Sequence, residues 1–325
     1  MTDARIFHRD NIVVDGLNAS WFLEPIALRR LHQGGVTAVN ATLAAWHGRA
    51  ETLDVIGGVY QNIAQHPDLA CQVLSVADIH KAKAAHRVGL IFGFQDTSPI
   101  DGKLHNLEIY HRLGVRIMQL TYNAANPSGC GCQVAEDKGL TSFGREVIAE
   151  MNRLGILLDL SHCGPRTTLE AIDVSTQPVA ITHANAAAFV PSPRNKSDEA
   201  LQACVAKGGI VGAIAVPVLI ARNMPAKLAD YLSAIDDLVG RVGVDHVALG
   251  PDFMEDMPKE VMEASVRDLP PAAVAAYAAM PPTAGFESVT EIPRVTEGLL
   301  ARGYQPEDVK KIIGGNWLRL YEQVW

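Results

Sequence analysis

The sequence has few cysteines, has no secretory start and lacks a long apolar run. Five cysteines occur among 325 residues, and their odd number and their spacing differ from those of a secreted disulfide scaffold. The first ten residues, MTDARIFHRD, are polar and charged, and no apolar signal core follows them. No stretch approaches the roughly 20 apolar residues that are needed to cross a bilayer. These features predict a cytoplasmic protein that does not bind a membrane.

An excess of basic residues is also missing, because the formal net charge is -8. This charge argues against nucleic acid and against an anionic membrane face as partners. It places no restriction on a small-molecule substrate, which is the partner that we expect. Hydrophobic residues make up 48% of the chain, which is enough for a large buried core.

Short apolar runs alternate with helix-like segments along the chain. The runs are rich in Val, Ile and Leu, which is typical of parallel strands covered on both faces. Between them lie amphipathic segments such as Thr141–Leu154 and Lys227–Val242. The eight predicted strands are Asn11–Asp15, Val36–Asn40, Val88–Phe94, Val115–Thr121, Gly155–Leu160, Pro178–Thr182, Gly209–Ala213 and His246–Gly250.

Eight strand–helix units in succession predict an α/β fold, namely a (β/α)8 TIM barrel in which residues 1–325 form one catalytic domain. An open doubly wound sheet is the alternative, but DGLNAS after the first strand is not its Gly-rich turn. An irregular insertion at about 254–290 is predicted to contain a helix and to be either a passive connection or a lid. A last helix is predicted at roughly Gln305–Gln323.

Histidines and an aspartate follow three of the predicted strands, at the end of the barrel where active sites lie. His162 follows the fifth strand, His183 the sixth and Asp252 the eighth. Two imidazoles and a carboxylate are a common set of zinc ligands. We therefore predict that His162 and His183 bind a metal and that Asp252 is a catalytic base or a further ligand. The alternative is that both histidines only bond to neighbouring backbone.

Other polar residues at the same end are candidates for binding substrate. Gln95 follows the third strand and is a weak candidate metal ligand, because its amide oxygen carries no charge. Tyr122 follows the fourth strand and could bond to a developing oxyanion. Arg194 and Asn195, in SPRNKSDE, could hold a substrate carboxylate. The alternative for Arg194 is an ordinary solvated position.

At these residues the chain resembles the membrane (renal) dipeptidase family of amidohydrolase-type metallo-barrels. The most specific segments are MNRLGILLDLSHCGPRTTLEAI, PVAITHANAAAF, PSPRNKSDEAL and the closing GGNWLRLY. The resemblance implies a TIM-barrel metallohydrolase that cleaves dipeptides with two zinc ions, and it implies a homodimer. It also implies that His162 and His183 hold one zinc, that Arg194 binds the substrate carboxylate and that Asp252 handles the proton.

The sequence departs from this family at the ligands of the other zinc. After the first strand the family has Asp-Gly-His-Asn-Asp, whose His and last Asp are ligands, whereas residues 15–19 read Asp-Gly-Leu-Asn-Ala. The bridging glutamate of the family is replaced by Gln95, and Tyr122 stands where many members have a substrate-binding histidine. We therefore expect one zinc ion rather than two, or no metal at all.

Three functions are consistent with these residues. The first is a one-metal hydrolase that cleaves an amide or dipeptide bond in a small carboxylate-bearing substrate. The second is a metal-free pseudoenzyme or small-molecule-binding barrel, which the loss of three ligands favours. The third is a metal-free lyase or isomerase that uses Asp252 and Tyr122 for proton transfer. We rank them in this order.

Overall fold

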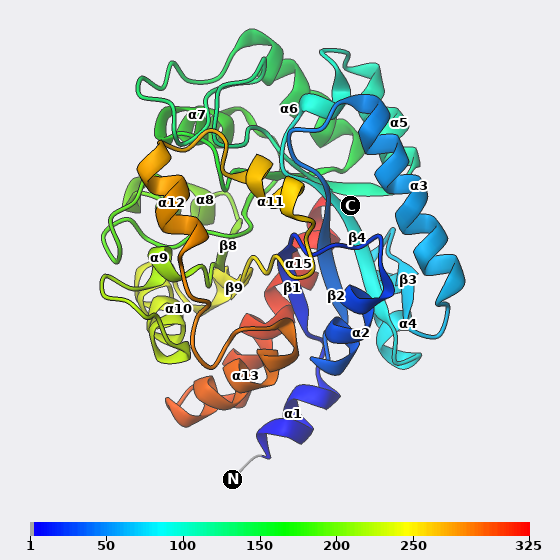
Figure 1. The fold of residues 1–325 in the computed structure, drawn as a ribbon, viewed down its shortest axis with the longest axis vertical. Helices are drawn as coiled ribbons and strands as arrows, with labels where there is room; N and C mark the ends of the chain where they lie inside the picture. Colours follow the sequence, from blue (N-terminus) through cyan, green and yellow to red (C-terminus); the bar gives the residue numbers. More distant parts are fainter. Residues whose placement is uncertain (1–2) are drawn as a thin grey trace.

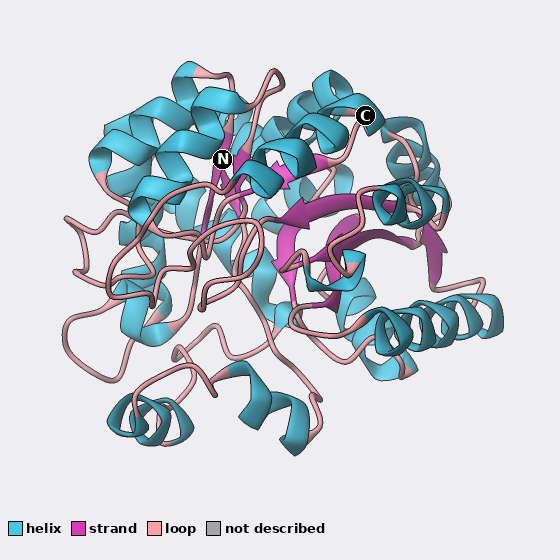
Figure 2. Ribbon diagram, turned by 90° about the horizontal axis from the view of Figure 1, so that it is seen from above, coloured by secondary structure: helices cyan, strands magenta, loops and turns pink. Residues whose placement is uncertain are grey.

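The computed structural model describes residues 3–325, which form a parallel β-barrel surrounded by helices (Figure 1). Figure 2 shows the strands near the centre of the molecule and the helices around them. The strands run in the order β1-β2-β4-β5-β6-β7-β8-β9, and β3 pairs with β4 beside this path. Their bounds are Val14–Asn18 (β1), Ala38–Ala44 (β2), Ala70–Gln72 (β3), Val88–Phe94 (β4), Val115–Gln119 (β5), Leu157–Asp159 (β6), Ala180–Ile181 (β7), Ile210–Ala213 (β8) and Val247–Leu249 (β9).

The barrel is nearly closed where the ends of β1 and β9 meet. A bridge joins Asn18 to Phe253, and the backbone amide of Ala19 donates to the carbonyl of Phe253 at 2.8 Å. The predicted TIM barrel is therefore confirmed, and the doubly wound alternative is wrong. All eight predicted strands correspond to strands of the barrel, although β1 begins three residues later than predicted. Asn11 is the reason for this shift, because it ends the preceding helix α1 (Ala4–Asp10).

The helices between the strands cover the outside of the barrel. In α6 (Ser142–Leu154), the side chain of Thr141 caps the first turn, and Gly155 ends the helix with a φ of 73°. Its buried face packs on the barrel through Val147, Ile148 and Met151. The other helices up to the last strand are α2 (Pro25–Gln33), α3 (Arg49–Gln65), α4 (Val76–Ala84), α5 (His105–Arg112), α7 (Pro165–Val174), α8 (Asp198–Ala206), α9 (Pro217–Ile220) and α10 (Leu228–Val242).

The C-terminal segment packs against the end of the barrel where the strands begin. After α13 (Ile292–Ala301), the predicted last helix is observed as α14 (Pro306–Lys310), one π-helical turn (Lys311–Gly315) and α15 (Asn316–Val324). The indole nitrogen of Trp317 in α15 donates to the carbonyl of Leu249 at 2.9 Å. The barrel's inward-facing residues pack on α15 in one buried cluster that includes Val14, Ala38, Ile91, Ile117, Leu157, Ala180, Ile210, Ala248, Trp317, Leu320 and Tyr321. The polar side chains of the barrel therefore lie at its other end, at the carboxyl ends of the strands.

The insertion after β9 contains two short helices, α11 (Lys259–Ser265) and α12 (Pro271–Ala278). Figure 1 shows both helices lying across the face of the molecule, near β8 and β9. The guanidinium of Arg267, between them, lies 5.5 Å from the ring centre of Trp46, which follows β2. The insertion thus extends from the end of β9 past β1 to the loop that follows β2.

Candidate active site

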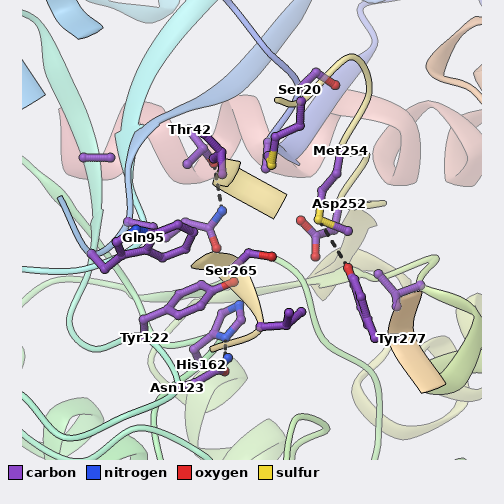
Figure 3. Close-up of a pocket in the computed structure, with 18 of the residues that line it drawn as sticks. Ser20, Thr42, Gln95, Tyr122, Asn123, His162, Asp252, Met254, Ser265 and Tyr277 are labelled. Atoms are coloured by element: carbon purple, nitrogen blue, oxygen red, sulfur yellow. Dashed lines mark hydrogen bonds between the residues drawn. The ribbon is translucent and has the colours of Figure 1, made fainter. Parts of the chain in front are cut away.

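A cavity of about 400 Å³ lies at the carboxyl ends of the strands, where residues of the α11–α12 insertion form part of its wall (Figure 3). Most of its wall is apolar, and its polar side chains come from the loops that follow the strands. Of the residues predicted for the site, the cavity is lined by Gln95, Tyr122, His162, Arg194 and Asp252. His183 and Asn195 are buried outside this lining.

The two predicted histidines lie together at the ends of β6 and β7. Nε2 of His162 is 3.1 Å from Nε2 of His183, and the ring centres are 5.0 Å apart. Burial lowers the pKa of both imidazoles well below the usual value, and the positive charge of Arg194 lowers it further. Both rings are therefore neutral at pH 7, the form in which imidazole binds metals.

Each imidazole is oriented through its other nitrogen. Nδ1 of His162 lies 2.8 Å from the side-chain oxygen of Asn123, which can only accept. Nδ1 of His183 lies 2.7 Å from the hydroxyl of Thr182, and that hydroxyl donates its single proton to Asp159 at 2.7 Å. Both Nδ1 atoms therefore carry the ring proton, and both Nε2 atoms are acceptors.

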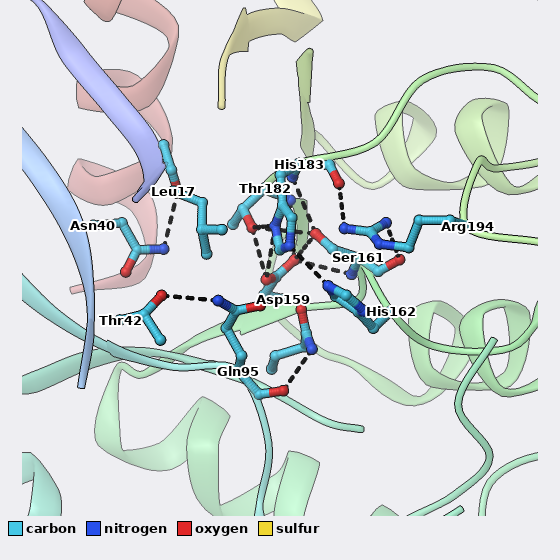
Figure 4. A network of polar contacts seen from close by, with 12 residues as sticks. Leu17, Asn40, Thr42, Gln95, Asp159, Ser161, His162, Thr182, His183 and Arg194 are labelled. Carbon is cyan, nitrogen blue, oxygen red and sulfur yellow. Dashed lines mark hydrogen bonds and ion pairs between the residues drawn. The ribbon is translucent and has the colours of Figure 1, made fainter. Parts of the chain in front are cut away.

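Asp159, the last residue of β6, organises both histidine-bearing loops and was not predicted. Its carboxylate accepts from the hydroxyl of Ser161 at 2.6 Å and from the backbone amide of Thr182 at 2.9 Å. Figure 4 shows these bonds linking the two strand ends in one network. The sequence gives no signal for this role, because Asp159 lies inside an apolar run that reads only as a strand.

Arg194 connects the same two strand ends from the loop after β7. Its two terminal nitrogens donate to the backbone carbonyls of Ser161 at 2.8 Å and His183 at 2.6 Å. It is only 7% exposed, so it is not a solvated surface residue. Arg194 also lines the cavity, and its guanidinium has three more N–H groups than these two bonds use.

The neighbouring Asn195 is occupied within its own loop. Its side-chain oxygen accepts from the backbone amide of Asn185 at 3.1 Å, and its amide group donates to the carbonyls of Val190 and Leu219. The interpretation of Asn195 as a substrate-binding residue finds no support in these contacts. The next residue, Lys196, is also buried, and its ammonium donates to the carbonyl of Cys163 at 2.6 Å.

Asp252 has a left-handed backbone, with a φ of 65°. This conformation is uncommon for a residue other than glycine and is often found at functional sites. Burial raises the pKa of its carboxyl group to about 6, and the opposing effect of Arg194 is smaller. Figure 3 shows the carboxyl group directed into the cavity, next to Met254 and Tyr277. A carboxyl group in this state can accept or release a proton near neutral pH.

Tyr122 and Gln95 line the wall of the cavity that faces Asp252 (Figure 3). The ring of Tyr122 stacks on His162 with centres 4.2 Å apart and meets Trp46 edge-on at 5.5 Å. The amide nitrogen of Gln95 donates to Thr42 at 2.9 Å. Figure 3 shows the amide oxygen of Gln95 on the side of the cavity. This oxygen is the only atom of its side chain that could contact a metal.

Leu17 and Ala19 occupy the positions where the resemblance places two metal ligands. Leu17 is 2% exposed, and Figure 4 shows it beside the polar network. Within residues 3–325, no three or more His, Cys, Asp or Glu side chains are grouped so that they could hold a metal ion. The described part of the chain therefore offers two imidazole ligands, without the third acidic or imidazole ligand of a closed site.

No helix in residues 3–325 is both long enough and apolar enough to span a membrane.

The five cysteines are all free thiols, and three of them, Cys130, Cys132 and Cys163, are buried near the site. The backbone amide of Cys132 donates to the carbonyl of His162 at 2.7 Å, so this loop also holds the histidine in place.

Residues 14–269 match the family model of membrane dipeptidases (peptidase family M19). The chain is 30% identical to dipeptidase aclJ of Aspergillus oryzae over 84% of its length, and 29% identical to dipeptidase tcpJ of Claviceps purpurea over 76%. It spans 61% and 53% of the length of these curated relatives. Both relatives extend well beyond the part that they share with this chain.

Solved structures share the fold over the whole chain. An amidohydrolase from Pseudomonas aeruginosa is 35% identical, with a TM-score of 0.95 and coverage of 100% of this chain and 99% of the other. A metallo peptidase from Rhodobacter sphaeroides, liganded with a phosphinate mimic of the dipeptide L-Ala-D-Ala, is 22% identical with a TM-score of 0.82. The match covers 97% of this chain and 100% of that one; at this identity it establishes the fold alone.

Proposed function

Because the chain belongs to the membrane dipeptidase (peptidase M19) family, we propose that it hydrolyses an amide bond in a small carboxylate-bearing molecule with one zinc ion. The ion would be held by His162 and His183. The observation that carries the proposal is the 3.1 Å between their Nε2 atoms, which are both acceptors when the two Nδ1 atoms carry the ring protons. The lone pairs of two such acceptors repel each other unless a cation lies between them.

The spacing of the donor atoms supports one ion rather than two. Two imidazole nitrogens that bind one tetrahedral zinc at about 2.05 Å lie about 3.3 Å apart, close to the separation of the Nε2 atoms. The orienting oxygens of Asn123 and Thr182 are the kind of partner that metal-binding histidines have. A second ion would need ligands at Leu17 and Ala19, whose side chains cannot coordinate.

The chain's own residues supply the remaining functions. When bound, zinc supplies Lewis acidity to an amide carbonyl. Asp252, with an unusually basic carboxylate at the cavity wall, would take a proton from water and pass it to the leaving nitrogen. Arg194 would bind the substrate carboxylate through the N–H groups that it does not use on backbone carbonyls. Tyr122 would pack on the substrate and donate from its hydroxyl.

Metal titration of the purified protein tests this function. We expect chelated protein to bind one equivalent of zinc, and His162→Ala and His183→Ala to lose that binding and the amide hydrolysis together. A matched control is His80→Ala, since His80 lies in α4, away from the cavity lining. Hydrolysis that persists in chelated protein, or in His183→Ala, would refute the one-metal function.

A metal-free binding barrel is the second candidate. It is favoured by the lack of a third histidine or acidic ligand among the described residues. In that case the chelated and zinc-loaded proteins would bind the same small carboxylates with equal affinity, and neither would hydrolyse them. Calorimetry with both forms of the protein therefore separates the two candidates.

A further inference from the structure

The charged side chains of the cavity restrict which molecules can enter it. Among the described residues that line it, Arg194 is the only arginine or lysine and Asp252 is the only acidic residue. The pair can serve one substrate carboxylate and one proton transfer. If Asp252 handles the proton, no carboxylate remains for a substrate ammonium group, because Gln95 is neutral.

The rest of the wall is apolar and surrounds this polar end. Phe22 and Leu23 follow β1, Val216 and Leu219 lie at α9, and Val266 comes from the insertion. A free ammonium group buried against such a wall would lose its hydration and find no carboxylate other than Asp252 among the lining residues, which is unfavourable. An apolar acyl chain or ring would instead be stabilised there, because its burial removes apolar surface from water.

The insertion after β9 adds more apolar side chains to the wall of the cavity. Met254, Met257 and Val261 line the cavity from this segment, and the hydroxyl of Tyr277 donates to the sulfur of Met254 at 3.3 Å. Methionine side chains adapt to apolar groups of different shape. The segment that covers the cavity therefore adds flexible apolar surface and no further charge.

We propose that the substrate is an N-acyl amino acid with an apolar acyl group and a free carboxylate, rather than a dipeptide with a free amino terminus. This inference rests on the proposed amide hydrolysis and names its substrate class. Water would add its oxygen to the acyl carbon, the C–N bond would break, and the nitrogen would receive a proton. The products are a fatty or aromatic acid and an amino acid, and no oxidant or reductant is needed.

Binding to chelated protein tests the substrate class without relying on hydrolysis. N-hexanoyl-alanine and norleucyl-alanine have the same chain length and differ only by the α-ammonium group, so they form a matched pair, used with both alanine enantiomers. We expect N-hexanoyl-alanine to bind at least 10-fold more tightly. Equal binding, tighter binding of norleucyl-alanine, or binding of neither would overturn the proposal.

Two further ligands test the two ends of the cavity. Each buried CH₂ group strengthens binding about fourfold, so N-acetyl-alanine, with four fewer, is expected to bind on the order of 100-fold more weakly than N-hexanoyl-alanine. N-hexanoyl-ethylamine lacks the carboxylate and should also bind more weakly. No dependence on chain length would overturn the apolar acyl site, whereas a clear preference without zinc-dependent hydrolysis would refute only the proposed function.

A pair of variants tests the location of the acyl site. Val218 in α9 lines the cavity and is 43% exposed, whereas Leu53 in α3 is 42% exposed and lies outside the lining. Because both side chains are partly exposed, a glutamate at either position is compatible with folding. We expect Val218→Glu to weaken binding of N-hexanoyl-alanine about 10-fold and Leu53→Glu to leave it unchanged. Unchanged binding in Val218→Glu would place the acyl group elsewhere and overturn the assignment.

Discussion

The backbone amide of Asp252 donates to the carbonyl of Leu17 at 3.1 Å. This bond lies where β1 and the end of β9 close the barrel, so a position where the resemblance places a metal ligand is bonded to the predicted catalytic acid. Leu17 is one of the residues that link the two ends of the sheet, and it is buried in the polar end of the barrel. The leucine at this position is therefore a local difference on an intact scaffold.

Restoring the replaced ligands should restore a second metal ion. We expect the variant Leu17→His, Ala19→Asp, Gln95→Glu to bind close to two equivalents of zinc, because it regains one imidazole and two carboxylates. Leu17→His alone is the control and should remain at one equivalent. The measurement is metal content per chain after dialysis against zinc. A folded triple variant that still binds one equivalent would contradict the assignment of these positions.

The strands of the barrel could be predicted because each is an apolar run that is buried on both faces, one toward the barrel interior and one toward the surrounding helices. The run 178–182 illustrates this, since its centre forms β7 although only Ala180–Ile181 pairs as a strand. The short strand β3 was missed because Ala70–Gln72 has no branched apolar run and pairs only with β4. The pattern reports burial, whereas only Ala70 of β3 is fully buried.

The proximity of His162 and His183 could also be predicted, since residues that follow neighbouring strands converge at one end of a barrel. The residues that orient them could not. Asp159 resembles any other residue of an apolar strand. Asn195 resembles a free polar side chain, because one of its backbone partners, Leu219, lies 24 residues further along the chain. Hydrogen bonds to distant backbone leave no periodic signal in a sequence.

The oxygen of Asn123 should control the affinity of His162 for metal. In Asn123→Ala, Nδ1 of His162 loses the acceptor at 2.8 Å, so the ring is free to change tautomer and orientation. Such a loss typically lowers metal affinity 10- to 100-fold, and we expect zinc affinity to fall by about that factor. Competition with a chromophoric chelator measures the affinity. If Asn123→Ala binds zinc as tightly as the unaltered protein, His162 is not a ligand.

The carboxyl group of Asp252 should set the acidic limb of the pH–rate profile. A general base must be ionised, and its pKa is raised to about 6, so we expect the hydrolysis rate to fall about tenfold per pH unit below this value. In Asp252→Asn, kcat should fall by about 10²- to 10⁴-fold and the limb should disappear. Binding of N-hexanoyl-alanine is the control for an intact cavity. If the acidic limb of the pH–rate profile persists in Asp252→Asn, the limb reports the ionisation of another group.

Asp15 should make folding stability depend on pH in the opposite sense to an ordinary carboxylate. Burial raises the pKa of its carboxyl group to about 8, and its bonds to Asn18 and the backbone of Leu17 offset only part of this effect. The unfolded chain loses this proton near pH 4. Between pH 4 and 8 the folded state therefore holds a proton that the unfolded state has released, so stability falls as the pH rises.

In Asp15→Asn this loss of stability is removed, but the new amide has one acceptor oxygen, whereas Asp15 accepts at both of its oxygens, from the backbone of Leu17 and the side chain of Asn18. We expect the variant to be less stable than the unaltered protein at pH 5, by about 1–3 kcal/mol for the unpaired group. The difference should shift in favour of the variant by up to a few kcal/mol at pH 8. Urea unfolding of both proteins at the two pH values measures it. A difference that is the same at pH 5 and pH 8 would mean that Asp15 is ionised in the folded barrel.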